Sequence, residues 1–209
     1  LSANILYSDQ PFMGSPLSAT TARDSLDMVR IVFGDLERPV MISNINALAP
    51  LQYAQEMTAP IMLFAGHRQA LIITGTSIMG ATAPMKIAGL QTVNNAAILA
   101  GIVLSQLVRP GCPVVYGTAG NPMDMRTGSF YVASAETHMI MALGVALARF
   151  YKLPCRSGGG LSDAHAFDFQ AGAQSGMMLL ATCQNRIYFV LHTCGILGAY
   201  MAMNQAKFI

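Results

Sequence analysis

The chain has 209 residues, of which 53% are hydrophobic and only 11% are charged. Soluble domains usually carry about 25% charged residues, so this shortfall needs an explanation. The formal net charge of +2 argues against a nucleic-acid-binding protein, because such proteins show a basic patch or stripe. The high hydrophobic content argues against a disordered chain. The length permits one large domain, and we expect residues 1–209 to form it.

Two uncharged stretches, 87–108 and 187–206, are long enough to span a bilayer, which takes about 20 residues. Both contain amide side chains, and the second contains His192. In lipid these polar groups need a buried partner or a wet cavity. Neither stretch has an aromatic belt or a flank rich in Lys and Arg. The N-terminus begins at Leu1 with no secretory leader, so we expect no membrane partner.

The cysteines lie at scattered positions without a C-x-x-C pair: Cys112, Cys155, Cys183 and Cys194. This spacing supports neither a zinc knuckle nor a small disulfide scaffold, so we expect reduced thiols in a cytoplasmic protein. A metal site needs three or four ligands, and the most promising segment offers only two or three. We therefore expect no metal.

Short apolar runs alternate along the chain with longer stretches of helical character. Strands are expected at 40–43, 70–74, 113–116, 153–156 and 187–191, with 3–9 as a candidate sixth. Helices are expected from Pro50 to about 66, from about 89 to 108, from the cap Ser134 to about 151, from the cap Asp163 to about 184, and onward from Gly195. This strand–helix alternation is typical of βαβ units and a parallel sheet.

The fold class expected from this alternation is α/β, an incomplete (β/α)8 TIM barrel with about five or six βα units. A closed barrel of this kind takes about 250 residues, so this chain is short by two or three units. An open doubly wound sheet is the alternative architecture. Against it, the first βα turn lacks the G-x-G-x-x-G pattern, and no acidic residue stands where a ribose partner would.

Much of the scarce polarity of this chain follows the predicted strands. Functional residues of parallel barrels cluster there, at the carboxyl ends of the strands. The side chains concerned are Asn44, Asn46, Thr76, Ser77, Thr82, Asn121, Asp124, Arg126, Thr127, Ser157, Ser162, Asp163, His165, Asp168, His192, Thr193 and Cys194. Their gathering on one predicted face indicates a protein that carries a functional site.

The segment 158–168 carries the most information, because three glycines precede an acidic and histidine-containing run. Glycines permit a positive φ or a close backbone approach to a ligand. Asp163 suits the cap of the next helix. His165 and Asp168 are three residues apart and would share a helix face, so the carboxylate can orient the imidazole as a base or donor. A cap and a surface ion pair without further function are the alternatives.

The loop 117–129 is long for a βα connection, whose usual length is about 2–6 residues. It contains Asp124 and Arg126, which form either part of a site or a plain loop ion pair. His67 and His138 lie in helical, apolar surroundings, and we interpret both as structural.

Several blocks of the sequence resemble, in order, the trimethylamine methyltransferase (MttB) superfamily. The first, Ala81-Thr-Ala-Pro-Met-Lys-Ile-Ala-Gly89, is similar to that family's GATxPxTxAG segment. Further similar blocks are 94–107, 110–117, 123–128, 153–154, 162–165, 168–172 and 191–197, so that the resemblance covers roughly residues 25–209.

The resemblance implies a TIM barrel that removes a methyl group from trimethylamine or from a quaternary amine such as glycine betaine. The acceptor it implies is the cobalt of a corrinoid carried by a separate protein that docks over the barrel mouth. This chain would bind no cofactor tightly itself. The chemistry is nucleophilic displacement, so the enzyme supplies positioning and electrostatics.

The resemblance also suggests roles for individual residues. Asp163, His165 and Asp168 are expected to be catalytic. Tyr116 is the best aromatic candidate to hold a methylated ammonium, ahead of Phe130 and Tyr131. Arg126 is expected to bind a substrate carboxylate or to contact the corrinoid protein. Gln170 and His192 complete the expected substrate-binding set.

The chain departs from the family pattern in two respects. Full-length members are much longer, and trimethylamine-specific members carry pyrrolysine, whereas this sequence shows only the twenty standard residues. A member without pyrrolysine points to a quaternary amine, unless the pyrrolysine lies outside this segment or was read as another residue. A truncated or degenerate homologue that binds a ligand or partner without turnover is the alternative function. The expected helix at 134–151 has few charges, which predicts cover by other parts of the protein or by a homo-oligomer.

Overall fold

The computed structural model describes residues 1–34 and 36–208. Over these residues, the main sheet holds six parallel strands in the order β1-β2-β3-β5-β7-β8. They are β1 (Phe12–Gly14), β2 (Met41–Ala47), β3 (Ala70–Gly75), β5 (Val114–Thr118), β7 (Cys155–Ser157) and β8 (Phe189–Val190). The first five are followed by the helices α2 (Ala19–Phe33), α3 (Gln55–Gly66), α4 (Ile87–Val108), α5 (Ala135–Phe150) and α6 (Phe169–Gln184).

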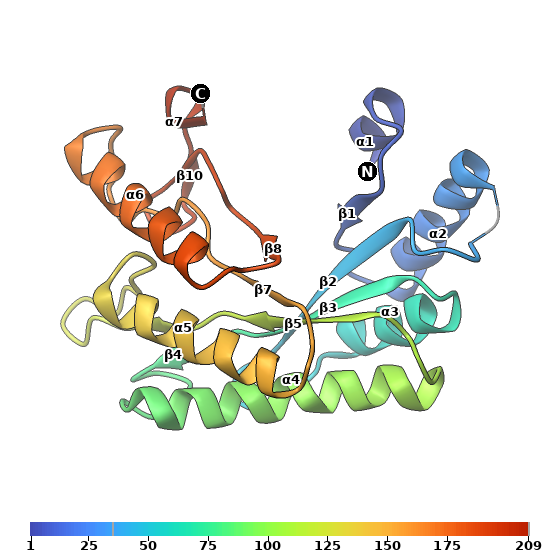
Figure 1. The fold of residues 1–209 in the computed structure, drawn as a ribbon, viewed down its shortest axis with the longest axis horizontal. Coiled ribbons are helices and arrows are strands. Elements are labelled where there is room, and N and C mark those ends of the chain that lie inside the picture. The colour runs from blue at the N-terminus through green and yellow to red at the C-terminus, as the bar shows by residue number, and fades with distance from the viewer. Residues whose placement is uncertain (35, 209) are drawn as a thin grey trace.

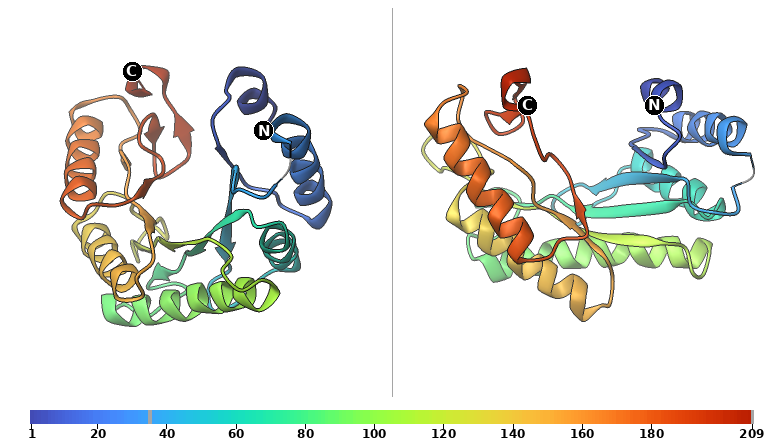
Figure 2. Two further views of the ribbon diagram at one scale, coloured as in Figure 1. Left: turned by 45° about the vertical axis from the view of Figure 1, so that its right-hand side comes forward. Right: turned by 45° about the horizontal axis from the view of Figure 1, so that its top comes forward.

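The sheet curls, and the five long helices lie along its outer side (Figure 1). In the left view of Figure 2 the strands and helices form an open ring, with the N- and C-terminal segments on the two rims of its gap. Short elements complete the described chain: α1 (Ser2–Tyr7), the parallel pair β4 (Ile78–Met79) and β6 (Asn121–Pro122), the antiparallel pair β9 (Ile196–Leu197) and β10 (Ala202–Met203), and α7 (Gln205–Phe208). The prediction of an incomplete TIM barrel is confirmed.

Alternation along the strands decides which side chains meet the helices and which face the inside of the curl. Successive strand residues point to opposite faces. Ile45 of β2, Tyr116 of β5 and Cys155 of β7 are fully buried and pack with helix residues in the main core. Their neighbours Asn46 and Arg156 line a cavity on the other face of the sheet. The sheet therefore separates an apolar outer layer from a polar inner surface.

Helix starts follow local capping chemistry. Ser134 accepts a hydrogen bond from Thr137 N at the start of α5, as the sequence predicts. Ser18 and Thr21 form a reciprocal capping box at the start of α2. The side chain of Asp168 accepts from Ala171 N at the start of α6. The predicted cap Asp163 was therefore wrong, since α6 begins several residues later than expected.

Three further sequence expectations are corrected by the structure. Residues 3–9 hold α1 instead of a strand, and the sixth strand is β1 at Phe12–Gly14. The helix expected from Pro50 begins at Gln55, because Pro50 lies in a turn. Gly195 does not open a helix: β9, a turn and β10 follow it, and α7 begins only at Gln205. Glycine at φ +81° favours a turn at this position.

Among the described residues, α4 alone is a helix long and apolar enough to cross a membrane, by length and composition. It packs against β3, α3 and α5. Its amides bond inside the fold: Gln91 donates to Ile140 O, and Asn94 accepts from Ser77 N while donating to Ala119 O. A helix that covers a sheet, as α4 does, can have the same length and apolar composition. The other candidate stretch, 187–206, is broken into short strands and turns.

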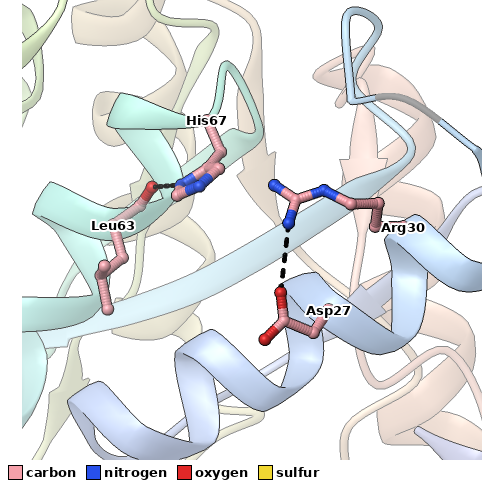
Figure 3. Close-up of polar contacts among 4 residues, drawn as sticks. All are labelled: Asp27, Arg30, Leu63 and His67. Atoms are coloured by element: carbon pink, nitrogen blue, oxygen red, sulfur yellow. Dashed lines mark hydrogen bonds and ion pairs between the residues drawn. The ribbon is translucent and has the colours of Figure 1, made fainter.

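Polar side chains on α2 and at the end of α3 make local contacts within their own helical segments (Figure 3). His67 Nδ1 lies 2.8 Å from Leu63 O, one turn back in the same helical segment. Arg30 pairs with Asp27 at 3.3 Å along α2, and both side chains are more than half exposed. His138 makes the equivalent contact with Ser134 O at 2.8 Å. These contacts agree with the structural interpretation of both histidines.

Candidate functional site

A cavity of about 420 Å³ opens on the inner face of the sheet. Its walls come from strands far apart in the sequence: Met13, Ser15, Asn44, Asn46, Thr76, Ile78, Ala119, Gly120, Asn121, Phe130, Arg156, Leu191, His192 and Tyr200. Many of these residues end a strand or follow one, which is where parallel barrels carry their sites. A smaller cavity of about 40 Å³ adjoins it and shares Arg156, His192 and Tyr200.

Arg156 of β7 is the buried charge of this site. The residue is 8% exposed, and its Nε is buried without a hydrogen-bond partner. Among the described residues, its guanidinium makes one side-chain contact, from Nη2 to His192 Nε2 at 3.4 Å. Burial lowers the pKa of Arg156 from its ordinary value, but that value is so high that the group stays charged.

His192 follows β8 and lies beside this guanidinium. Burial, and to a lesser extent the charge of Arg156, lower the pKa of its imidazole from its ordinary value. Since the guanidinium can only donate, Nε2 of His192 accepts and its proton lies on Nδ1. His192 lies on the cavity wall, and its predicted role in substrate binding stays a prediction.

Aromatic rings form another part of the wall. The rings of Phe130 and Tyr200 lie 6.4 Å apart between centroids, and Tyr200 meets the ring of His192 edge-on at 5.0 Å. Tyr200 is in the turn between β9 and β10, with φ +76°, so a sharp turn brings it back toward β8. Aromatic faces of this kind attract a cation.

Amides of β2 line the opposite wall. Asn44 Nδ2 donates to Asn46 Oδ1 at 3.3 Å, and Asn44 Oδ1 accepts from Thr74 Oγ1 of β3 at 3.2 Å. The sequence places both asparagines in a loop after a strand, but the structure places them within β2. Their period-two spacing sends both side chains to the inner face. They are neutral groups, so the charge of the cavity comes from Arg156 on β7.

The glycines after β7 bring two chain segments into contact. Gly160 N donates to His192 O at 2.9 Å, and Gly159 N donates to Thr182 Oγ1 of α6 at 3.3 Å. Lys207 Nζ of α7 donates to Gly160 O at 2.8 Å. This close approach positions the segment that carries His192, and it accounts for the run of glycines noted in the sequence.

Asp163 acts on the backbone of a neighbouring loop. Its Oδ1 accepts from Val132 N at 2.7 Å and its Oδ2 accepts from Ala133 N at 3.0 Å. These bonds connect the segment after β7 to the entrance of α5. With both oxygens occupied, the carboxylate holds the loop that contributes Phe130. Its predicted catalytic role stays a prediction, and its contacts are those of a positioning residue.

The structure separates the other predicted catalytic residues from the cavity walls. His165 is exposed and lies against the turn at Gly198, where an added Cβ would be 3.3 Å from its Nδ1. Asp168 is exposed and caps α6, and Gln170 is exposed on its first turn. His165 and Asp168 share no helix face, because residue 165 precedes the helix.

Tyr116 and Arg126 also lie away from the cavity. Tyr116 is fully buried between the sheet and the helices, where its hydroxyl donates to Asn95 Oδ1 at 2.9 Å and its ring stacks on Tyr151. Arg126 is exposed on the loop after β6, whose Asp124 accepts from Arg126 N rather than from its guanidinium. The period-two pattern of β5 sends Tyr116 outward.

Sequence reasoning missed two main features of this site, Arg156 and Tyr200. A signal existed for Arg156: it is a charge at the carboxyl end of a short strand in a chain with few charges. None existed for Tyr200, which reaches the wall only through the β9–β10 turn. Over residues 1–34 and 36–208, no group of three His, Cys, Asp or Glu side chains is placed to hold a metal ion.

Asp163 and Asp168 provide a matched test of structural and catalytic roles. Asp163→Asn replaces an acceptor by a donor facing a backbone N–H, and we expect it to lower the free energy of unfolding by about 1–3 kcal/mol. Asp168→Asn keeps a good cap, so its stability should change little. Urea unfolding measures both. Loss of turnover in stable Asp168→Asn would instead support the catalytic prediction for that residue.

Comparison with known proteins identifies the family. A family model described as trimethylamine methyltransferase (MTTB) matches residues 1–209. The chain belongs to this family. The resemblance seen in the sequence blocks is thereby confirmed, over a longer stretch than the roughly 185 residues, 25–209, that carry those blocks.

Curated relatives of this methyltransferase family extend the comparison. A glycine betaine methyltransferase of Desulfitobacterium hafniense (strain Y51) is 43% identical over 213 residues, covering 100% of this chain and 44% of the relative. A proline betaine:corrinoid methyltransferase of Eubacterium limosum is 37% identical, covering 97% of this chain and 44% of the relative. Trimethylamine methyltransferase MttB of Methanosarcina barkeri (strain Fusaro / DSM 804) is 31% identical, covering 74% and 32%. The chain thus spans less than half the length of these relatives.

Proposed function

We propose that the protein containing this chain transfers a methyl group from a quaternary amine to the cobalt of a corrinoid held by a partner protein. The observation that carries the proposal is the aromatic wall of Phe130 and Tyr200 inside the half-barrel of this family. Aromatic faces stabilise a methylated ammonium by cation–π attraction, with no need for a negative charge. The names of two relatives, which refer to glycine betaine and proline betaine, support a quaternary amine as substrate.

The size of the cavity supports a separate carrier for the acceptor. About 420 Å³ accommodates a small amine, whereas a corrinoid is far larger. The acceptor therefore approaches from outside, over the carboxyl ends of the strands. When bound there, the reduced corrinoid supplies the nucleophile for the displacement.

The role of this chain in that displacement is positioning. The aromatic wall holds the ammonium and directs one methyl group toward the opening, and the surrounding side chains exclude water from the carbon. As the carbon–nitrogen bond breaks, its electron pair stays on nitrogen and a neutral tertiary amine leaves. A positive nitrogen makes that departure possible without a general acid, so the reaction needs no proton from His165 or Asp168.

The proposal is tested with the protein in its full length. Purified protein, reduced cobalamin and each of glycine betaine, carnitine and trimethylamine are mixed without oxygen. Methylcobalamin is followed by its absorbance, and the demethylated amine by mass spectrometry. Stoichiometric appearance of both products from a quaternary amine is expected. Calorimetric binding without any turnover would favour the alternative, a homologue that binds its ligand without reacting.

Exposed apolar side chains on α5 support the expectation that other parts of the protein or another subunit cover this helix. Met139, Leu143 and Phe150 are 56%, 45% and 77% exposed. We propose a homo-oligomer that acts in the cytoplasm, and its buried, reduced Cys112 and Cys155 agree with that compartment.

The aromatic wall predicts a specific effect on substrate binding. Tyr200→Leu removes a ring from the ammonium site and is expected to raise KM for the quaternary amine about 3- to 30-fold, while Tyr200→Phe retains most of the affinity. Tyr131→Leu is the matched control, because the Tyr131 hydroxyl bonds to Asp124 and its ring lines neither cavity. Steady-state kinetics measure KM for each variant. An equal rise in KM for Tyr200→Leu and Tyr131→Leu would contradict this role of Tyr200.

A further inference from the structure

The buried guanidinium of Arg156 is not neutralised by any carboxylate of the described residues. No acidic side chain among residues 1–34 and 36–208 lies within ion-pair distance of it, and its Nε is buried without a partner. A buried charge is costly unless it is paired and hydrogen-bonded. The unpaired donors therefore indicate a missing acceptor.

The polar groups that the structure describes near Arg156 do not fill this role. His192 offers one neutral acceptor, Nε2, at 3.4 Å. Asp163 acts electrostatically on Tyr200, as does Arg156, but its carboxylate bonds to the backbone of Val132 and Ala133 and forms no ion pair with the guanidinium. The asparagines of β2 bond to each other and to Thr74. The described residues thus leave the guanidinium without a charged acceptor, and the cavity that it lines has room for one on a ligand.

The position of Arg156 indicates which chemical class of ligand fits the cavity. It lines both cavities together with Tyr200, and Phe130 lies on the wall of the larger one. A planar guanidinium presents a rigid fork of donors that matches a carboxylate. The same positive charge repels a ligand that carries only an ammonium group. A zwitterion suits both groups, with its carboxylate on the guanidinium and its ammonium on the aromatic rings.

We propose that Arg156 binds the carboxylate of the substrate, so that the protein selects quaternary ammonium carboxylates over cations such as choline and tetramethylammonium. This inference rests on the proposed function for its reaction but makes its own claim about binding. It assigns to Arg156 the carboxylate role that sequence reasoning gave to Arg126. His192 orients the guanidinium through Nη2 and is a positioning residue.

Calorimetry on the full-length protein, without any methyl acceptor, tests this claim. Glycine betaine, choline and tetramethylammonium share the methylated nitrogen and differ in the carboxylate. We expect the wild-type protein to bind glycine betaine at least about 10-fold more tightly than either cation. Arg156→Gln should weaken glycine betaine binding about 10- to 150-fold, as expected for loss of charge-assisted hydrogen bonds, and leave the two cations unchanged or tighter.

Arg126→Gln is the matched control, because it removes an exposed guanidinium from a loop outside the cavity. It should leave all three affinities unchanged. Loss of betaine affinity in Arg126→Gln alone would overturn the assignment, as would an equal loss for all three ligands in Arg156→Gln. If Arg156→Gln does not fold by circular dichroism, the wild-type preference among the three ligands and Arg156→Lys, which keeps the charge without the fork, decide the question.

These outcomes are separable from failure of the proposed reaction. Selective betaine binding that depends on Arg156, without methyl transfer to cobalamin, would leave this inference standing and overturn the proposed function. Equal turnover of glycine betaine and choline would leave the proposed function standing and overturn the role of Arg156.

Discussion

Replacing Gly159 with alanine is expected to destabilise the fold by about 2–4 kcal/mol and to displace the segment that carries His192. Gly159 has φ +130°, a conformation that side chains rarely adopt. An added Cβ would lie 2.2 Å from Leu191 O and 2.8 Å from His192 O. Both neighbours are backbone atoms, so the clash cannot be relieved by turning a side chain. The segment after β8 would have to move, and a cavity wall with it.

Guanidinium-chloride unfolding measures the loss of stability, and calorimetry with glycine betaine measures the loss of the site. Gly172→Ala in α6 is the matched control, since an added Cβ meets no atom within 4 Å there. Alanine at a helical position should stabilise the protein by about 0.5–1 kcal/mol. Wild-type stability and ligand affinity in Gly159→Ala would contradict the proposed contact between the glycine run and the end of β8.

The second large effect is expected at Tyr116, which is fully buried in the outer core. Tyr116→Ala leaves a cavity between β5 and the helices, and we expect it to lower the free energy of unfolding by about 3–5 kcal/mol. Tyr116→Phe keeps the ring but removes the hydrogen bond to Asn95 Oδ1, with an expected loss of about 1–2 kcal/mol. Urea unfolding of the two variants measures these losses.

Kinetics of Tyr116→Phe separate this core role from the substrate-binding role predicted from the sequence. Because Tyr116 lines neither described cavity, its KM for a quaternary amine should equal that of the wild type. Tyr200→Phe is the comparison, because it makes the same substitution at a residue on the cavity wall. A raised KM in Tyr116→Phe with unchanged stability would favour the sequence prediction.

Much of the fold could be predicted because its signals are local. A cap such as Ser134 acts within one turn, and an apolar run such as 70–74 marks a buried parallel strand wherever its partners lie. The alternation of these runs with helices is enough to indicate a parallel barrel. Errors appeared where two local signals compete. Asp163 and Asp168 both suit a helix cap, and the backbone bonds that Asp163 makes to a distant loop left the role to Asp168.

The candidate site was predicted less well, because it depends on which face of a strand each side chain occupies. Tyr116 ends the strand predicted at 113–116 and is aromatic, which suits a substrate site, yet in the structure it lies in the middle of β5 and its side chain points toward α4. In the sequence Arg156 is one more charge, and its significance lies in a buried Nε for which the described residues provide no hydrogen-bond partner. This can be recognised only once the positions of the neighbouring side chains are known.

The amino-acid sequence by itself determined the family, the parallel half-barrel and the end of the sheet where polar groups gather. These rest on local periodicity, capping and motif order, none of which needs long-range contacts. Only the tertiary structure decided that Arg156, His192 and Tyr200 share one wall. The physical reason is that inward and outward positions differ by a single residue along a strand, and the charge balance of a cavity is set by segments that meet only in the folded chain.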